Sequence, residues 1–418
     1  MKFSDKEVHR ILNSRIVDAD RICLIGSESF PKVVRDDWEH RGIPVSNSVD
    51  SETSQVLLYG ALEDVPDVYM FLMEVNGPAS HNCRITIISF SRLWHSWFKP
   101  KSKSKEIGNW IPPEEIVNLL ELSDLEVVSS RQFILLPIYI PFVSRFINRW
   151  LAPLPFFRWF TAVNVISARK RRQNLSAASL SIIIAARNEY GNISQLIDRI
   201  PKLANYQEVI FVEGGSQDAT WDVIQEEVAS QRRRQDFVVS AYKQDGKGKG
   251  DAVRKGFENA SGEILMILDA DISVEPEELH KFTEALLSDS CEFANGTRLV
   301  YPLEVDAMRT LNIIGNRVFG LLFTFLLGQH LADTLCGTKV LWKKDYERIA
   351  ASRSYFGDFD PFGDFDLLFG AARLNLRIRD IPIHYKSRTY GATNISRFRH
   401  GLLLLRMTWI AALRLKFI

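Results

Sequence analysis

The sequence predicts an α/β protein whose C-terminal part forms a doubly wound, mostly parallel sheet. Three observations predict this class. From residue 180 onward, short apolar runs of strand length alternate with segments of helical periodicity. The runs are continuously apolar, as in strands that helices cover on both faces. Polar and charged residues follow the ends of the runs, where ligands bind in sheets of this class.

The elements of this part follow one another in a regular order. The expected strands are residues 180–185, 208–212, 237–241 and 264–268. The expected helices are residues 193–200, 219–228 and 251–260. Gly262 caps the third helix, and Pro276 lies near the start of the next, where its missing N–H costs no hydrogen bond.

Composition and charge exclude several classes of protein. The chain has 418 residues, enough for two or three domains, and its 52 Lys and Arg nearly balance its 51 Asp and Glu. We therefore expect no nucleic-acid partner, because no overall field attracts one. The four cysteines form no CxxC pair, which argues against a zinc site and a disulfide framework. The polar N-terminus, MKFSDKEVHR, is unlike a secretory signal, so we expect a cytoplasmic protein.

Three apolar segments are candidates for contact with a membrane: residues 133–166, 318–327 and 402–418. Prolines and arginines interrupt the first, and the second has only half of the roughly 20 apolar residues that span a bilayer. All three fit helices that lie in a membrane interface, with apolar faces and basic flanks. Amphipathic helices that pack on a protein core are the alternative. We expect a peripheral protein on the cytoplasmic face of a membrane.

The polar, basic segment SARKRRQNLSAAS, residues 167–179, is the best candidate for a linker. We therefore expect four regions along the chain. They are a smaller α/β domain over 1–130, apolar interfacial helices with the basic linker over 131–179, the doubly wound domain over 180–400 and an amphipathic helix over 401–418.

Charged residues follow the first two expected strands of the doubly wound domain. The segment after the first strand reads RNE, and the segment after the second reads EGGSQDAT. Glycines let a ligand approach the backbone, and an acid can accept a hydrogen bond from a ribose or a base. Ordinary turns, with Asp218 as a helix cap, are the alternative. The candidate donor-binding residues are Arg187, Glu189, Glu213 and Asp218.

The loop QDGKGKG, residues 244–250, opens the third helix. Helix N-termini and lysines such as Lys247 and Lys249 both attract phosphate. The loop lacks the GxxxxGK[ST] pattern of a P-loop. A solvated turn is the alternative on local grounds.

Asp269 and Asp271 follow the fourth expected strand, with Ala270 between them. On an extended strand, positions i and i+2 point to the same side, so the two carboxylates would repel unless a cation binds them. Hard divalent cations such as Mg²⁺ and Mn²⁺ suit carboxylate oxygens. A DxD by itself is a weak signal, but this one follows a basic glycine loop and two other polar strand ends. The convergence predicts a metal–nucleotide site.

Three further motifs lie on the C-terminal side of this pair: DTLCGTK at 333–339, FGDFDLL at 362–368 and RTYGATNISR at 388–397. Asp364 and Asp366 are candidate general bases, or simply acids at the start of a helix. The candidates for binding an anionic acceptor share a positive charge. They are Arg298, Arg309, Arg317, Lys339, Arg388 and Arg397.

In order and spacing, these motifs resemble those of family-2 glycosyltransferases of the GT-A fold. The resemblance covers residues 178–418 and is strongest to the branch of dolichyl-phosphate mannose and glucose synthases. It implies an inverting hexosyltransferase that uses a nucleotide-diphosphate sugar with Mg²⁺ or Mn²⁺. It also implies that Glu189 and Glu213 contact the nucleoside, with Arg187 and Asp218 nearby. Asp269 and Asp271 would be the metal-binding pair, with Asp271 the direct ligand.

The acceptor decides the remaining chemistry. A polyprenyl phosphate at the membrane surface is already anionic and needs positive charge around it. A hydroxyl acceptor of polysaccharide or glycolipid synthesis needs a base, which Asp366 or Asp364 would supply. Two lower-ranked alternatives are a sugar-phosphate nucleotidyltransferase and a non-catalytic scaffold for lipids or partners. The first would want a GxGxRL-type signature where this chain reads AARNEYGN.

The N-terminal part resembles a truncated class I methyltransferase. RICLIGSESF, residues 21–30, is similar to the first strand of such a domain, and residues 84–91 are similar to a later one. The glycine-rich loop of the family is missing after Gly26, and Asp50 is the best candidate for the acid that binds the cofactor ribose. We therefore expect a degenerate domain that serves as a scaffold or binds a partner protein or a second copy.

Overall fold

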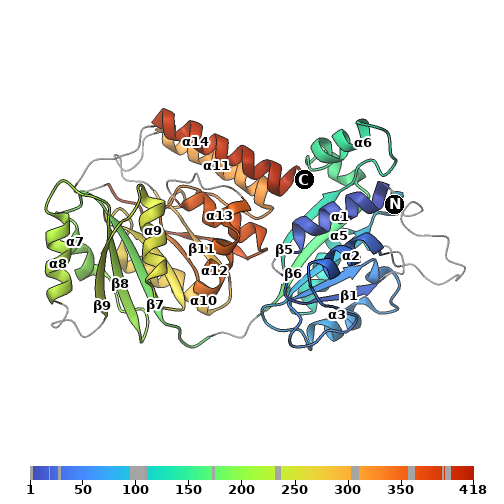
Figure 1. The fold of residues 1–418 in the computed structure, drawn as a ribbon, viewed down its shortest axis with the longest axis horizontal. Helices are drawn as coiled ribbons and strands as arrows, with labels where there is room; N and C mark the ends of the chain where they lie inside the picture. The colour runs from blue at the N-terminus through green and yellow to red at the C-terminus, as the bar shows by residue number, and fades with distance from the viewer. Residues whose placement is uncertain are drawn as a thin grey trace, which may run out of the picture. The chain divides into compact units, whose positions relative to one another are not determined.

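The computed structural model describes residues 3–17, 19–26, 30–94, 109, 111–171, 175–230, 237–302, 310–355, 363–387, 390 and 397–418. The chain divides into two compact units, which Figure 1 shows as ribbons. Unit 1 comprises Met1–Arg172, Arg373–Asn375 and Ala412–Ile418, and unit 2 comprises Gln173–Ala372 and Leu376–Ala411. Each unit contains its own buried apolar core.

Unit 2 is built on a seven-stranded sheet of order β13-β11-β12-β10-β7-β8-β9. The strands are β7 (Leu180–Ala186), β8 (Gln207–Glu213), β9 (Val238–Lys243), β10 (Ile264–Asp269), β11 (Phe293–Thr297), β12 (Lys339–Trp342) and β13 (Ile378–Pro382). β12 runs antiparallel to both of its neighbours, and every other pair is parallel. The predicted doubly wound, mostly parallel architecture is confirmed.

Helices cover this sheet because its strands are apolar on both faces. The helices of unit 2 are α7 (Ile193–Arg199), α8 (Thr220–Ser230), α9 (Lys249–Glu258), η6 (Pro276–Leu279), α10 (His280–Leu287), α11 (Thr310–Leu327), α12 (Lys343–Ala351), η7 (Arg353–Tyr355), α13 (Asp364–Arg373) and α14 (Arg397–Ala411). Gly256 lets α9 lie directly on β7, because a Cβ at this position would collide with Ile183. This close packing fixes the N-terminus of α9 near the sheet edge.

Unit 1 contains a six-stranded sheet of order β2-β1-β3-β4-β6-β5. The strands are β1 (Ile22–Gly26), β2 (Val45–Ser46), β3 (Gln55–Tyr59), β4 (Arg84–Phe90), β5 (Leu125–Phe133) and β6 (Val163–Lys170). The helices are α1 (Phe3–Arg15), α2 (Lys32–His40), η1 (Ala61–Glu63), α3 (Val68–Asn76), η2 (Arg92–Trp94), α5 (Pro113–Leu122), α6 (Val143–Phe146), η3 (Ile147–Leu151), η4 (Phe157–Phe160) and η8 (Ala412–Lys416). The unit is α/β, as expected.

The expected linker at 167–179 is wrong at its N-terminal end, because residues 167–170 belong to strand β6. Glu126 lies opposite Arg169 in the β5–β6 ladder, and the two form a buried ion pair with an N–O distance of 2.6 Å. The Lys170 ammonium donates to the carbonyls of Asn76, Gly77 and Ala79. Arg169 and Lys170 are therefore part of a sheet strand, and both charges find partners within unit 1.

Two other expected boundaries also need correction. Residues 131–133 belong to β5, so the sheet of unit 1 extends beyond the expected limit at residue 130. The expected C-terminal helix at 401–418 begins earlier, at Arg397, and α14 ends at Ala411 in unit 2. Residues 412–418 belong to unit 1, where Arg15 and Arg131 donate to the carbonyl of Leu415 at 2.9 and 2.6 Å. Long-range packing of this kind leaves no periodic signal in the sequence.

Within the described residues, no helix combines the length and the apolarity that a membrane span requires.

Candidate functional site

The parallel strands of unit 2 bring the predicted polar strand ends to one edge of the sheet. In the strand register, Asp269 of β10 lies beside Ala185 of β7, and Glu213 of β8 lies between Ala186 and Lys243. Asp269 and Glu213 are therefore separated only by β7. The sequence prediction that these two acids meet at one edge is consistent with this register.

The turns after β7 and β8 are tied to each other. Asn188 adopts a left-handed conformation, and its side chain accepts a hydrogen bond from the Gln217 amide at 2.8 Å. The backbone N–H of Glu189 donates to the Thr220 hydroxyl, and the carboxylate of Glu189 accepts from Asn192 at 2.6 Å. These bonds hold Glu189 in place at the sheet edge, while Arg187 is exposed beside it.

Glu213 and Asp218 shape the turn that connects β8 to α8. Glu213 is buried and accepts a hydrogen bond from the backbone N–H of Ser216. Asp218 accepts from the backbone and hydroxyl of Thr220, the first residue of α8. Burial raises the pKa of Asp218, but these hydrogen bonds outweigh it and lower the pKa overall. Asp218 thus caps helix α8, which was the alternative to a function in binding the sugar nucleotide.

The glycine–lysine loop folds around the start of α9. Gly248 precedes the helix with a φ of 88°, which favours glycine. Asp251, in the first turn, accepts from the backbone N–H of Gly246 at 2.8 Å. Lys247 is exposed, whereas Lys249 reaches the sheet edge. The loop therefore presents one lysine to solvent and one to the strand ends.

Three distant motifs meet at Asp269, and a fourth contacts the lysine loop beside it. Its carboxylate forms an ion pair with Lys249, with an N–O distance of 2.5 Å. Gly337, from the DTLCGTK motif, lies so close that a Cβ there would collide with both side chains. Gly363, which precedes α13, has a φ of +75°, and a Cβ there would lie 2.9 Å from the Cα of Gly250. The DxD, the lysine loop and the DTLCGTK motif are thus in contact with one another, and the FGDFD motif touches the lysine loop at Gly250.

Asp271 lies beyond the end of β10, in a turn. The geometric argument for positions i and i+2 of a strand therefore does not apply to it, because the strand ends at Asp269. Asp271 is buried, as is Ala270, and its Oδ1 accepts from the backbone and hydroxyl of Ser273 at 3.0 and 2.6 Å. Ile272 has a φ of 53°, a strained value for a β-branched residue. The tight turn holds the buried carboxylate.

Asp366, in the first turn of α13, is paired with an arginine. The Arg353 Nε lies 2.7 Å from the Asp366 carboxylate, which is buried. Burial lowers the pKa of Arg353, but its hydrogen bonds to Asp366 and Tyr346 raise it overall. The carboxylate of Asp366 is therefore engaged by a cation within unit 2. Asp364 is the first residue of the same helix.

Two predicted acceptor-binding cations are engaged inside unit 2. Arg298 donates two hydrogen bonds to the fully buried Asp333, at 2.7 and 2.9 Å. Burial raises the pKa of Asp333, but Arg298 and Asn316 lower it overall to about 2. Lys339 is also buried and donates to the Cys336 carbonyl. These contacts give Arg298 and Lys339 an internal structural function.

The other acceptor-binding candidates lie further along the chain. Arg317 is exposed on α11. Arg397 is the first residue of α14. Arg309 and Arg388 lie outside the described residues.

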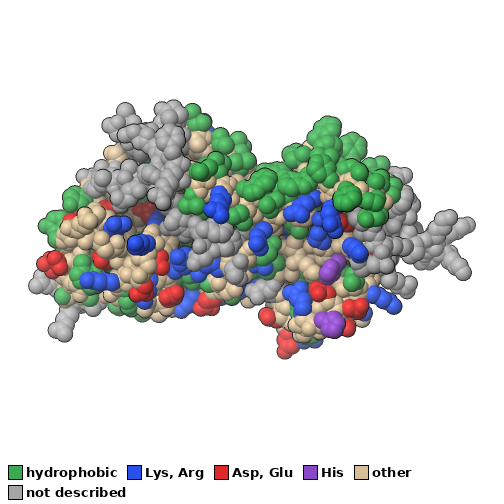
Figure 2. Space-filling view, turned by 45° about the horizontal axis from the view of Figure 1, so that its top comes forward, with side chains coloured by type: hydrophobic (Ala, Val, Ile, Leu, Met, Phe, Trp, Pro, Cys, Tyr) green, Lys and Arg blue, Asp and Glu red, His purple; other side chains and the backbone are tan. Residues whose placement is uncertain are grey.

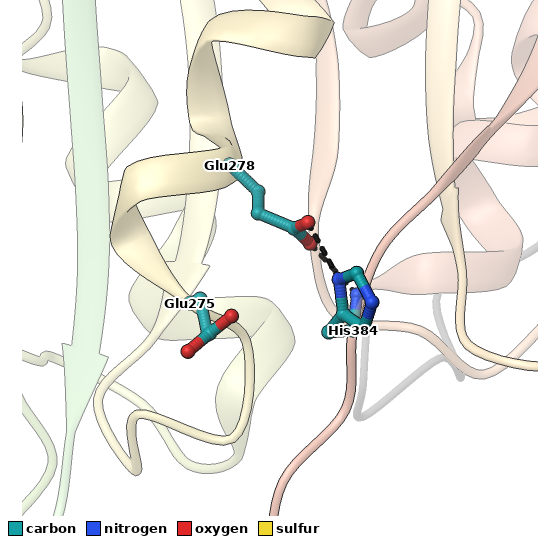
Figure 3. Close-up of side chains that lie close together, drawn as sticks. All are labelled: Glu275, Glu278 and His384. Atoms are coloured by element: carbon teal, nitrogen blue, oxygen red, sulfur yellow. Dashed lines mark hydrogen bonds and ion pairs between the residues drawn. The ribbon is translucent and has the colours of Figure 1, made fainter. Parts of the chain in front are cut away.

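Glu275, Glu278 and His384 form the one group of three or more His, Cys, Asp or Glu residues, within the described part of the chain, whose spacing could suit a metal ion. Figure 3 shows Glu278 facing His384, whose Nδ1 lies 2.8 Å from the carboxylate. Lysines already pair with both acids: Lys281 lies 2.6 Å from Glu278, and Lys386 lies 2.5 Å from Glu275. The cluster is therefore a set of ion pairs that anchors the segment after β13.

This segment also bonds to the turn that follows Asp271. The N–H of Lys386 donates to the Ser273 carbonyl at 2.9 Å, and Val274 forms an antiparallel bridge with Tyr385. Residues 384–386 are therefore fixed near the DxD, immediately before the RTYGATNISR motif. Sequence patterns could not predict these ion pairs, because their acidic and basic residues come from two distant segments of the chain.

The family model described as "Glycosyl transferase family 2" matches residues 181–350. This match covers the strand ends, the glycine–lysine loop, the DxD and the DTLCGTK motif. The matched part of unit 2, residues 181–350, is thus similar to a family-2 glycosyltransferase domain. The FGDFD motif and α14 lie beyond the matched residues.

Curated relatives agree with this assignment. "Glycosyltransferase AglD" of Haloferax volcanii is 26% identical over 250 residues, which are 57% of this chain and 38% of that protein. "Dolichol-phosphate mannosyltransferase" of Pyrococcus furiosus is 35% identical over 124 residues, which are 29% of this chain and 33% of that protein. The chain thus spans between a third and two fifths of the length of these two relatives.

A solved structure is also similar to this family-2 domain. Glucosyl-3-phosphoglycerate synthase from Mycobacterium tuberculosis, in complex with Mn²⁺ and UDP, has a TM-score of 0.40 and 20% sequence identity. The similarity covers 57% of this chain and 80% of that one.

Proposed function

We propose that this chain is an inverting hexosyltransferase that moves a sugar from a nucleotide-diphosphate sugar to a polyprenyl phosphate at a membrane surface. The observation that carries the proposal is the meeting of Lys249, Asp269, Gly337 and Gly363 at the edge where β7, β8 and β10 end. Parallel sheets bind nucleotides at this edge. The names of the relatives, which include a dolichol-phosphate mannosyltransferase, support a lipid phosphate as acceptor.

The two carboxylates of the DxD suit a divalent cation. Asp269 and Asp271 offer hard carboxylate oxygens, the ligands that Mg²⁺ and Mn²⁺ prefer. Asp269 pairs with the Lys249 ammonium, so its carboxylate already faces positive charge at this point. When bound, a divalent cation would supply Lewis-acid assistance to the departing diphosphate.

The chain's own residues would orient and neutralise the donor. Lys249 and the N-terminus of α9 would face the diphosphate, and Glu189 and Glu213 would face the nucleoside. The bond from the anomeric carbon to the diphosphate oxygen breaks, and its electron pair leaves with the nucleotide. The acceptor oxygen forms the new bond from the opposite face. Gly337 and Gly363 keep the site open, because side chains there would fill it.

Two helices of unit 2 support a membrane location for the acceptor. Ile314, Val318 and Leu321 of α11 are 54%, 50% and 74% exposed, and they share one helical face. On α14, Leu402, Leu405 and Trp409 are exposed at a similar spacing. Figure 1 draws both helices along the upper edge of unit 2. Apolar faces of this kind suit the interface of a membrane.

For the acceptor, we favour Arg317 and Arg397 as partners of a lipid phosphate. Arg317 is exposed on the apolar face of α11. Asp366 keeps a hydroxyl acceptor as a second candidate, because a buried ionised carboxylate can serve as a base. Its pairing with Arg353 favours a structural function instead.

For unit 1, we favour a degenerate methyltransferase-like scaffold. Its antiparallel strand β6 lies between β4 and β5 near one edge of the sheet. The sheet edge after β1 and β3 is filled by aromatic rings. The ring centroids of Phe30 and Tyr59 lie 5.1 Å apart, and those of Tyr59 and Phe90 lie 5.3 Å apart.

The experiment measures nucleotide release from a panel of sugar nucleotides, with Mg²⁺ or Mn²⁺ and either a polyprenyl phosphate or the matching polyprenol. We expect nucleotide release with the polyprenyl phosphate and none with the polyprenol. Activity with the polyprenol, together with a loss of several hundredfold in Asp366→Asn, would favour the hydroxyl acceptor. Release with neither acceptor from any donor would contradict the proposal.

A further inference from the structure

The segment between β5 and β6 of unit 1 has an inverted distribution of side chains. Two of its uncharged polar residues are buried: Ser144 is fully buried, and Asn148 is 4% exposed. Its large apolar residues face outward: Phe142 is 92% exposed and Phe146 is 58% exposed. A segment that packed in water would show the reverse arrangement.

The buried polar side chains hold the backbone of this segment together. The Ser144 hydroxyl accepts from the Ile140 amide at 2.7 Å and donates to the Ile138 carbonyl at 2.5 Å. The Asn148 amide group bonds to both the N–H and the C=O of Leu136, at 2.7 and 2.8 Å. Phe142 itself has a φ of 62°, a strained conformation for a bulky residue. The fold therefore holds the aromatic rings outward.

More aromatic residues extend this surface, which we call the aromatic rim. Its members are large side chains that are at least half exposed: Tyr139, Phe142, Phe146, Phe156, Trp159 and Phe160. Figure 2 shows hydrophobic side chains gathered over the α6 part of unit 1. Tyr, Trp and Phe at one surface are typical of the interface between lipid headgroups and acyl chains.

The charges around the aromatic rim are all of one sign along the chain. Residues 127–188 contain no Asp or Glu, whereas Arg145, Arg149 and Arg158 lie among the rim residues. The guanidinium of Arg149 lies 5.8 Å from the Trp150 ring centroid, and that of Arg158 lies 5.7 Å from the Trp159 ring centroid. A surface that is apolar at its centre and cationic around it complements an anionic bilayer.

Further cations lie beside this segment. The rings of Trp150 and Phe417 have centroids 5.1 Å apart, so the η8 turn packs against it. Burial, together with the charges of Arg131, Arg15 and Arg158, lowers the pKa of Lys416 to about 7. The arginines Arg131, Arg15 and Arg158 therefore lie close enough to Lys416 to act on its charge.

From these observations we infer that the aromatic rim docks unit 1 onto an anionic lipid bilayer. Unit 1 then contributes membrane attachment of its own, in addition to the apolar faces of α11 and α14. The inference does not require the proposed transfer activity, since it rests on residues of unit 1 alone.

The experiment is flotation of the full chain with phosphatidylcholine vesicles, with or without phosphatidylglycerol. We expect Phe142→Ser combined with Trp159→Ser to lower binding to the anionic vesicles by about tenfold or more. Arg145→Gln combined with Arg158→Gln should lower it by roughly tenfold, and added salt should remove this difference. Leu122→Ser, at a 60% exposed position on α5, is the matched control and should bind as the wild type does.

Two further measurements distinguish a loss of docking from a loss of folding or of transfer activity. Circular dichroism checks that each variant is folded, which we expect because the substituted side chains are exposed. Transfer to a short, water-soluble polyprenyl phosphate should be unchanged in the rim variants, so failure of docking is distinguishable from failure of the proposed function. Unchanged vesicle binding in both variants would overturn the inference. So would a wild-type dimer that Phe142→Ser converts to a monomer, because a second copy would then cover the rim.

Discussion

The two units place different chemistry at the same edge of an α/β sheet. In unit 2, the strand ends carry Asp269, Glu213 and Lys243, and glycines from distant motifs approach them without side chains. In unit 1, the edge after β1 and β3 is packed with aromatic rings, and Gly26 lies against the Tyr59 carbonyl, with which a Cβ would collide.

The difference shows that sheet topology alone does not make a binding site. Both sheets are built from buried strands with at least one antiparallel pair. Unit 2 leaves its edge polar and uses glycine where the motifs meet. Unit 1 packs aromatic rings at its edge, which stabilises the unit by burying apolar surface. Four predictions follow from this contrast.

The largest expected effect is on transfer by unit 2. Asp271→Asn should lower kcat/KM by roughly a thousandfold, because it removes a charged oxygen ligand and with it several kcal/mol of transition-state stabilisation. Steady-state nucleotide release under saturating Mn²⁺ measures it. Asp222→Asn, at an exposed position on α8, is the control. Near wild-type activity of Asp271→Asn would contradict the metal assignment.

The next effect concerns stability within unit 2. Asp333→Asn should lower the free energy of unfolding by about 3–5 kcal/mol, because it leaves the Arg298 charge buried without its counter-ion. Urea unfolding followed by circular dichroism measures the loss. If Asp333→Asn lowered the free energy of unfolding by less than Asp222→Asn does, the Arg298–Asp333 pair would contribute little to stability.

The Arg298–Asp333 pair also predicts that the free energy of unfolding falls at acid pH. The pKa of Asp333 is lowered from 3.8 to about 2 in the folded chain, so the folded state favours the ionised form. The stability from this group is complete above its unfolded value and is lost as the pH falls from 3.8 toward 2. Unfolding measured across this range should show a smaller acid dependence in Asp333→Asn than in the wild type. If stability fell equally with pH in both proteins, groups other than Asp333 would cause the loss.

The smallest effects test unit 1. Tyr59→Ala should destabilise the unit by about 3 kcal/mol, because it opens a cavity in the aromatic packing, and it should leave transfer unchanged. Tyr69→Ala, at an exposed position on α3, is the control. S-adenosylmethionine should cause no shift in the melting temperature. A saturable shift would show that the packed edge opens for a cofactor.

Local sequence patterns predicted much of unit 2. Continuous apolar runs indicated β7, β8 and β10, and the parallel order placed the residues after them at one edge. The same approach failed at Ser167–Lys170, because a basic run looks like a linker unless its partner is known. Glu126 lies 43 residues from Arg169, and no local pattern connects them. The sequence also indicated Arg298 as an acceptor cation, whereas Asp333 engages it inside the fold.

The sequence by itself determined the α/β class, the positions of the strand ends and the residue types that follow them, because these depend on periodicity over a few residues. Only the tertiary structure decided that Gly337 and Gly363 meet Asp269 and Gly250, and that Phe142 faces outward while Ser144 is buried. Such contacts depend on how distant segments pack, and packing is a property of the whole fold.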